Sequence, residues 1–396
     1  MKLWLIVCAQ FCGTSLWFAG NAIMPALLAD VPRIGSGTGG STALFTSAVQ
    51  LGFIAGTLFF SVLALADRYS PAKLFFLCSL LGASLNAFIP VLAGGPLSLG
   101  LLRLATGFCL AGIYPVGMKL AARWYPTRAG QAIGYLVGAL VLGTAFPHLV
   151  STGQGDWRMV LWIVSGLALL GGVLVLWGVG DPPGEVKAAV FRVRDLGSVF
   201  ASPQLRRAAC GYFGHMWELY AFWAAVPALL VLAIETRGAG EAAYDASLLA
   251  FFVIGAGAIG CVVGGLFSRR HGSAIVAFVQ LSGSGLLCLL APLIFGLDLV
   301  LILALLFLWG VLVAGDSPQF SAMAARTAPA AHVGTALTAV TGIGFALTIP
   351  SIQLLAYLID RGDPGWALLA LAPGPALGLW ALWPLLGARD QDGRRL

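Results

Sequence analysis

The chain is organised as long apolar runs separated by short stretches of charged and turn-forming residues. A helix that crosses a bilayer core needs about 20 mostly apolar residues, and the sequence contains twelve such runs. We therefore predict an all-α integral membrane protein with twelve transmembrane helices. Their expected extents are 3–29, 42–66, 71–92, 97–122, 129–151, 157–178, 207–234, 244–267, 273–293, 298–325, 331–359 and 363–386.

One polar stretch is longer than the others and divides the chain nearly in half. It covers 179–206, carries Asp181 and two prolines near its start, and continues with several arginines. This composition is typical of a solvated linker. We predict an N-terminal six-helix bundle over 1–178, a cytoplasmic linker over 179–206, and a C-terminal six-helix bundle with a short cytoplasmic tail over 207–396.

The basic residues indicate how the chain is oriented in the membrane. Cytoplasmic loops collect lysine and arginine, and the basic residues alternate loop by loop as twelve spans require. Of the 22 lysines and arginines, only Arg33, Arg158, Arg237 and Arg361 fall in outward segments. We expect both termini in the cytoplasm and a multi-pass protein of the cell inner membrane. A cleaved N-terminal signal peptide would leave eleven spans, so we keep 3–29 as the first helix.

Composition excludes several classes of protein. With 59% hydrophobic and 10% charged residues, the chain lies far from the soluble average. Topology and contact with anionic lipid account for the net charge of +6, so no nucleic-acid partner is expected. The seven cysteines all fall in spans without a CxxC pair, the four histidines are scattered, and no P-loop occurs. We expect no metal, no cofactor and no enzymatic activity.

The two halves repeat a pattern at a separation of 203 positions, which reads GxxxAGxxPxxxxxAARxxP. It is formed by Gly107, Ala111, Gly112, Pro115, Ala121, Ala122, Arg123 and Pro126, and again by Gly310, Ala314, Gly315, Pro318, Ala324, Ala325, Arg326 and Pro329. Matching prolines and an arginine are hard to obtain by chance, so we infer an internal duplication. Because six helices is an even number, both halves enter the membrane from the same side and the repeat is parallel.

The loop after the second span makes the chain resemble the major facilitator superfamily. The family's loop reads GxLaDRxGRr, and this chain has Leu65-Ala66-Asp67-Arg68 there. Leu63 and Ser70 stand where the family has glycines. In the second copy Ser268 replaces the acid. The resemblance implies a gating role for Asp67 and Arg68.

Two further motifs extend the resemblance over essentially the whole chain. Arg103 to Gly107 resembles the RxxxG motif of helix four, and Gly130 to Gly143 resembles the glycine-rich helix five, without the GPxxGG of drug antiporters. The resemblance implies a monomer whose spans one, four, seven and ten line a central cavity, with Arg103 linked to substrate or proton coupling. It also implies that the glycine-containing spans two, five, eight and eleven form the seam between the halves.

Three charged residues fall inside spans, where charge is costly and therefore indicates function. They are Arg103, Glu218 and Asp316, and His215 lies one turn before Glu218. A carboxyl removed from water is easier to protonate, and a nearby arginine opposes this. We expect Glu218 to carry the proton with His215 modulating it, Asp316 as second candidate, and Arg103 contacting an anionic group or keeping the acid charged. The alternative is a structural ion pair of Arg103 with Glu218 or Asp316.

A polar stripe on span one is the candidate substrate surface. Gln10, Thr14, Trp17 and Asn21 recur at i, i+4, i+7 and i+11 and so share one helix face. The alternative is that these polar residues join helices to one another.

Aromatic residues of the other cavity spans extend the candidate substrate surface. Tyr114, Phe222 and Phe320, together with Trp17, share faces with the charges. They favour a substrate with an apolar or planar part. Simple packing is the alternative.

These features predict a secondary active transporter that moves a small organic solute, anionic or amphipathic, by alternating access coupled to protons. A proton antiporter that exports drugs, metabolites or siderophores uses the same parts and is the first alternative. A non-transporting membrane sensor is the second; it would be expected to carry a long soluble tail, whereas this chain ends ten residues after Leu386.

Overall fold

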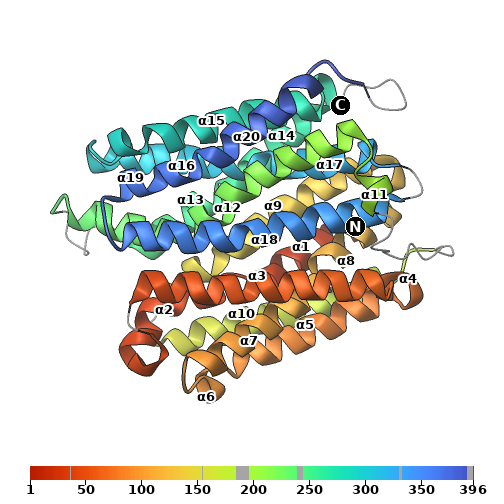
Figure 1. Ribbon diagram of the computed structural model, residues 1–396. Coiled ribbons are helices and arrows are strands. Elements are labelled where there is room, and N and C mark those ends of the chain that lie inside the picture. The colour runs from red at the N-terminus through yellow and green to blue at the C-terminus, as the bar shows by residue number, and fades with distance from the viewer. Residues whose placement is uncertain (36, 154, 184–195, 239–243, 330–331, 390–395) are drawn as a thin grey trace.

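The computed structural model describes residues 1–35, 37–153, 155–183, 196–238, 244–329, 332–389 and 396. Over these residues the chain is built from helices, with no β-strand element (Figure 1). Positions 184–195 of the predicted linker and 390–395 of the predicted tail lie outside the described residues.

Eleven helical segments of the described chain are long and apolar enough to cross a membrane, and they coincide with eleven of the predicted spans. The remaining prediction, 71–92, is the 17-residue helix α5 (Pro71–Ala87) followed by α6 (Ile89–Leu92), with Phe88 between them. The all-helical, multi-pass membrane class is therefore confirmed. The total of twelve spans and the side on which the termini lie stay predictions.

The first half begins near the N-terminus and ends before the linker. Its elements are α1 (Lys2–Thr14), α2 (Ala19–Asp30), η1 (Pro32–Ile34), α3 (Thr38–Val62), α4 (Leu65–Arg68), α5, α6, α7 (Pro96–Ala111), α8 (Tyr114–Trp124), η2 (Pro126–Arg128), α9 (Ala129–Ser151), α10 (Trp157–Val173) and η3 (Leu174–Val179).

The second half follows the short helix α11 (Leu196–Val199). Its elements are α12 (Pro203–Glu235), α13 (Ala246–Gly255), α14 (Gly257–His271), α15 (Ser273–Ile294), α16 (Leu299–Gly315), α17 (Ser317–Thr327), α18 (Val333–Ile359), α19 (Pro364–Leu368), η6 (Leu369–Leu371), α20 (Pro373–Leu382) and η7 (Trp383–Leu385). Both ends of the chain lie at the same end of the helix bundle as α4 and α11 (Figure 1).

The repeated prolines place the same break in both halves. The helices α7 and α8 meet just before Pro115, and α16 and α17 meet just before Pro318. Proline has no N–H and its ring clashes with the carbonyl four residues back, so a straight helix cannot continue through it. In the second half the carbonyl freed in this way, at Ala314, accepts a hydrogen bond from the Cys261 thiol at 3.3 Å.

Glycines bring helices together within each half. A Cβ at Gly107 would overlap the carbonyl of Val49, and a Cβ at Gly310 would overlap the carbonyl of Val253. The close contact of α3 with α7 is therefore repeated by α13 with α16. Gly52 also packs against α7 of its own half. This glycine therefore serves packing inside one half.

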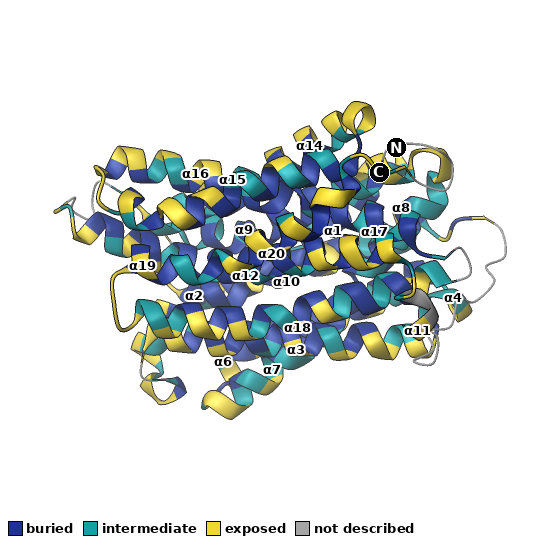
Figure 2. Cartoon of the chain, turned by 45° about the horizontal axis from the view of Figure 1, so that its top comes forward, coloured by how far each residue is buried: buried dark blue, intermediate teal, exposed yellow. Residues whose placement is uncertain are grey.

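Between the halves, α3 packs on α18, and α9 packs on α13 and α14. Two hydrogen bonds cross from α3 to α18. One joins Ser61 and Thr338 at 3.1 Å, and the other runs from Gln353 to Ser47 at 2.9 Å. Figure 2 shows buried residues between the helices and exposed ones on their outward faces. Large exposed apolar side chains such as Trp4, Leu97 and Trp380 suit contact with lipid.

Candidate functional site

A cavity of about 1240 Å³ lies between the two halves. Its walls come from α3, α8 and α9 of the first half and from α14, α17 and α18 of the second. The charged side chains that line it are Asp67, Lys119, Arg128, Arg269 and Arg326. The charged residues on the walls are therefore mainly basic, and they belong to the end of the bundle that the basic loops predict to be cytoplasmic.

A smaller pocket of about 30 Å³ adjoins the inner end of this cavity. The two share Tyr114, Met118, Ser321 and Thr341 as lining residues. No charged side chain of the described chain lines the pocket, and its polar atoms come mainly from tyrosine and serine hydroxyls. The cavity thus changes from a basic, wide mouth to a narrow, neutral inner end.

Six aromatic rings from both halves pack together at the inner end, and we call them the aromatic layer. Its members are Trp17, Phe18, Phe53, Tyr220, Trp223 and Phe345, of which the last three line the small pocket. Ring centroids lie 4.4 Å apart for Phe53 and Phe345, 5.6 Å for Trp17 and Phe345, and 5.7 Å for Trp17 and Tyr220. The layer joins the first half to the second and ends the cavity.

The helix α12 has two different faces. Tyr212, Met216, Leu219 and Trp223 line the pocket and recur at i, i+4, i+7 and i+11. This face is not predicted from the sequence, because the candidate site is predicted at the charged residues of the span instead. The regular spacing of large residues on a cavity helix is the signal that could have found it.

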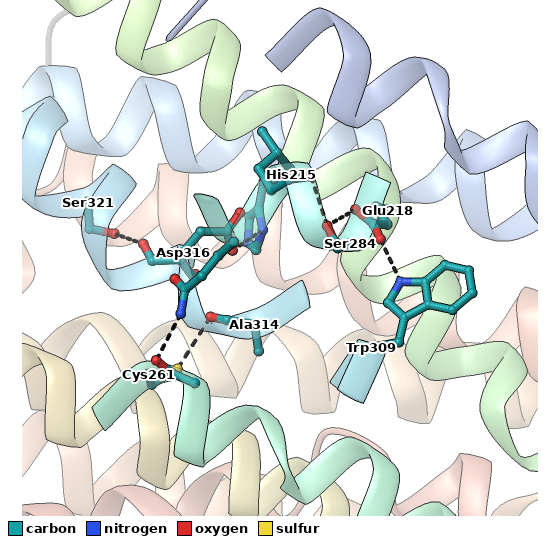
Figure 3. A network of polar contacts seen from close by, with 12 residues as sticks. His215, Glu218, Cys261, Ser284, Trp309, Ala314, Asp316 and Ser321 are labelled. Carbon is teal, nitrogen blue, oxygen red and sulfur yellow. Dashed lines mark hydrogen bonds and ion pairs between the residues drawn. The ribbon is translucent and has the colours of Figure 1, made fainter. Parts of the chain in front are cut away.

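The other face of α12 carries Glu218 into the interior of the second half. Its carboxyl is fully buried and accepts hydrogen bonds from the Trp309 indole N–H at 2.7 Å, the Ser284 hydroxyl at 2.9 Å and the Cys288 thiol at 3.4 Å (Figure 3). These donors belong to α15 and α16. Glu218 therefore lines neither of the two cavities and joins three helices behind the cavity wall.

His215 and Asp316 form a buried pair beside Glu218 (Figure 3). The His215 Nδ1 lies 2.8 Å from the Asp316 carboxylate, and both side chains are buried. Asp316 occupies the break between α16 and α17, and its chain neighbour Ser317 lines the small pocket. The structure thus brings together three predicted residues, His215, Glu218 and Asp316. Of these, the His215–Asp316 pair lies at the helix break, next to the residues that line the pocket.

Arg103 lies apart from this cluster, in the first half. Its guanidinium donates to the carbonyls of Leu16, at 3.2 Å, and Trp17. Among the described residues no carboxylate pairs with Arg103, and Asp316 pairs with His215 instead. The structure therefore does not show the alternative ion pair of Arg103 with Glu218 or Asp316, and the expected contact of Arg103 with an anionic group stays a prediction.

The polar stripe of span one turns toward other helices. The Trp17 indole donates to Gln50 at 3.2 Å, Asn21 donates to Thr46 at 2.9 Å, and the Thr14 hydroxyl donates to a carbonyl of its own helix. Gln10 is fully buried against Gly117. These contacts fit the interpretation that the stripe joins helices, and Trp17 reaches the cavity end through the aromatic layer.

The three predicted aromatic residues are separated in the structure. Tyr114 lines both the cavity and the small pocket. Phe222 stacks on Trp309 at 4.7 Å inside the second half, and Phe320 packs on His215 at 5.6 Å. Only Tyr114 of these three lies on the cavity wall.

Of the two predicted gating residues, Asp67 lines the mouth of the cavity and Arg68 follows it at the end of α4. Asp67 forms an ion pair with Lys119 of α8, and Lys119 also donates to the carbonyl of Ala66 at 2.9 Å. Arg68 is exposed. Ala64, which precedes α4, has a left-handed backbone with φ of 50°. The Asp67–Lys119 ion pair therefore holds the loop against α8, and Ala64 in the loop has a strained backbone.

Comparison with known proteins agrees with this architecture. The sequence pattern that describes the Major Facilitator Superfamily as a family matches residues 5–351. The chain is 29% identical over 236 residues to the Uncharacterized transporter YgaY of Escherichia coli O157:H7, covering 54% of this chain and 56% of that protein. It is 33% identical over 250 residues to an uncharacterized 38 kDa protein in the 23S RNA operon of Thermoproteus tenax, covering 61% and 59%. The chain thus spans less than two thirds of the length of these relatives.

A solved structure shares the fold. The human organic anion transporter MFSD10 (TETRAN) superposes with a TM-score of 0.72 at 15% identity, covering 96% of this chain and 98% of that one. The family model covers most of the chain, and the helical membrane fold and the duplicated halves agree with it. The chain therefore belongs to the Major Facilitator Superfamily of membrane transporters.

Proposed function

We propose that this protein is a secondary active transporter of the inner membrane that moves a small organic solute by alternating access. The observation that carries the proposal is the cavity of about 1240 Å³ between the halves, which is wide at the basic end and ended by the aromatic layer. Drug-sized ligands occupy pockets of about 300–1,000 Å³, so the cavity holds such a solute with room for water. The halves then rock about the contacts of α3 with α18 and of α9 with α13 and α14.

The lining supports an anionic or amphipathic solute. Arg128 and Arg269 are exposed at the mouth and raise the local concentration of anions. The inner end offers the faces of Tyr114, Tyr220 and Trp223, which suit a planar or apolar part. The structural neighbour named as an organic anion transporter is consistent with this class of solute.

Proton coupling is proposed at the His215–Asp316 pair, with Glu218 as the neighbouring acid. Asp316 sits at a helix break beside the pocket-lining Ser317, so rocking of the halves can change its access to water. Glu218 is enclosed by three donors on the far face of α12. This geometry favours Asp316 over Glu218 as the carrier, the reverse of the order that the sequence suggests.

Uptake by symport and export of drugs, metabolites or siderophores by antiport both use this cavity, and the direction of proton flow distinguishes them. The termini are proposed to lie in the cytoplasm because the basic residues at the cavity mouth belong to the predicted cytoplasmic end. A monomer is proposed in either case because the family resemblance implies one.

Cysteine labelling at the two ends tests alternating access. Ala122, on the cavity wall, and Ser47, buried between the halves at the other end, each become a cysteine in a background with the exposed Cys8 and Cys210 changed to serine. We expect a soluble maleimide to label Ala122→Cys rapidly and Ser47→Cys slowly but completely, as the protein visits the opposite state. A Ser47→Cys variant that never reacts in the folded protein would contradict alternating access, whereas fast labelling of both sites at once would indicate a channel.

A further inference from the structure

Helix one is interrupted at 15–18 without a proline in the break. In hydrocarbon every backbone polar group must find a partner inside the protein. The Ser15 N–H and hydroxyl bond to carbonyls of α1, and the Trp17 N–H bonds to the carbonyl of Thr14. The carbonyls of Leu16 and Trp17 accept hydrogen bonds from Arg103 alone among the described partners. Arg103 therefore replaces the helix hydrogen bonds that the break removes.

The surroundings of Arg103 are shaped for this task. Its side chain is 1% exposed, and its guanidinium lies at the C-terminal end of α1, where the helix dipole favours a positive charge. Gly20, at the start of α2, leaves it room, since a Cβ there would lie 3.0 Å from the Arg103 Nε. Charge and shape thus both match a guanidinium held by backbone carbonyls.

The break that Arg103 holds presents two aromatic rings to the other half. Trp17 packs on Tyr220 and Phe345, and Phe18 lies with its ring centroid 6.4 Å from Tyr220 and 6.3 Å from Trp223. The carbonyl of Trp17 itself is one of the two that Arg103 binds. A change in Arg103 is therefore transmitted directly to the rings that end the cavity.

We propose that Arg103 is a positioning residue of the gate at the inner end of the cavity. It fixes the unwound turn of helix one so that Trp17 and Phe18 meet the rings of the second half, which keeps the far end closed while the basic end is open. This role rests on the proposed alternating access, and it differs from contact with substrate or with a proton-carrying acid.

The test compares labelling of the two reporters, Ala122→Cys and Ser47→Cys, in Arg103 variants of the full chain. Only folded, monodisperse protein is counted, so the ratio of the two labelling rates is independent of yield. In Arg103→Met we expect the rate at Ser47→Cys relative to Ala122→Cys to rise about tenfold, the change that a shift of 1.4 kcal/mol produces. Arg103→Lys, which keeps the charge and one donor group, is expected to lie between Arg103→Met and the parent.

Two controls separate the outcomes. Trp17→Ala removes a ring of the gate directly and is expected to raise the same ratio, whereas Leu306→Met, at the position equivalent to Arg103 in the second half, leaves it unchanged. If Trp17→Ala raises the ratio and Arg103→Met lowers yield only, the positioning role of Arg103 is overturned and the gate remains. If neither parent nor variants ever react at Ser47→Cys, alternating access itself is contradicted.

Discussion

In the first half the central helix is broken and the buried charge is a cation, Arg103, held by backbone carbonyls. In the second half the corresponding helix α12 runs for 33 residues without a break, and the buried charges are the carboxyls of Glu218 and Asp316, with His215 beside the latter. A guanidinium stays protonated in proteins, whereas carboxyl and imidazole groups exchange protons. The first half thus supplies fixed geometry and the second half supplies titratable groups.

The repeat shows where the two halves differ. At the separation of 203 positions, Arg103 corresponds to Leu306 and Asp316 corresponds to Ile113, and both apolar residues are fully buried. The halves share the helix breaks at Pro115 and Pro318, but their charges occupy positions that are not equivalent. The shared breaks give both halves the same backbone course beside the cavity. The charges that are not shared give the first half a fixed guanidinium and the second half titratable groups.

The largest effect is expected when an acid is placed in the first half at Ile113, the position equivalent to Asp316. Ile113→Asp places a carboxyl at the position equivalent to Asp316 but without a histidine partner. A charge at membrane depth costs at least ~2.5–3.5 kcal/mol, so we expect a large loss of folded protein and a markedly lower midpoint of thermal unfolding. Ile113→Asn is the matched uncharged control and should lose less. Equal stability of Ile113→Asp and the parent would mean that the two breaks have the same environment.

Removing the Trp309 hydrogen bond to Glu218 tests whether this acid has a structural role. Trp309→Phe keeps the stacking on Phe222 and deletes the indole N–H. Because a buried acceptor loses one of its partners, we expect a destabilisation of about 1–3 kcal/mol in thermal unfolding. Proton-driven transport should persist in the remaining folded protein. Full stability with abolished proton coupling would instead make Glu218 the carrier.

The loops after spans two and eight allow a smaller comparison. Asp67→Asn breaks the ion pair with Lys119, whereas the equivalent Ser268 donates, among the described residues, to the carbonyl of Gly265 in its own helix. A partly exposed pair contributes about 0.2–1 kcal/mol. We expect Asp67→Asn to change the ratio of labelling at the two reporter sites by up to a few-fold, and Ser268→Ala to leave it unchanged. An equal effect of both variants would remove the difference between the loops.

The smallest expected effect is at Ala64, whose φ of 50° is the only positive value at a described residue other than glycine. Glycine adopts this conformation without strain. We expect Ala64→Gly to stabilise the folded protein by less than about 1 kcal/mol, because the relief of strain is partly offset by the greater freedom of the unfolded chain. A clear loss of stability in Ala64→Gly would show that the methyl group of Ala64 contributes packing that outweighs the strain.

The sequence predicts the large features of this fold because lipid imposes simple rules on length and charge. The eleven long spans follow from apolar runs, and the paired helix breaks follow from Pro115 and Pro318. The site is harder to predict because periodicity shows that residues share a face but not what that face meets. Trp17 and Asn21 share a face, yet they bond to Gln50 and Thr46 of the neighbouring helix.

The same limit applies to the charges. Glu218 bonds to α15 and α16, His215 pairs with Asp316 at the break between α16 and α17, and a neighbouring face of α12 with Tyr212 and Trp223 lines the pocket. The partner of Arg103 could not be found from side-chain types at all, since it consists of backbone carbonyls in an unwound turn. Such partners are visible only when helix ends are located in three dimensions.

The most direct test of the account is proton flux in proteoliposomes that hold the purified protein, screened against pools of organic acids, amphipathic cations and siderophore-like compounds. We expect a pool of anionic or amphipathic solutes to drive proton movement in the parent protein and in Glu218→Gln. The flux should be lost in Asp316→Asn, which keeps solute exchange. Proton movement that persists in Asp316→Asn, or its absence with every pool in the parent, would contradict proton-coupled transport through this site.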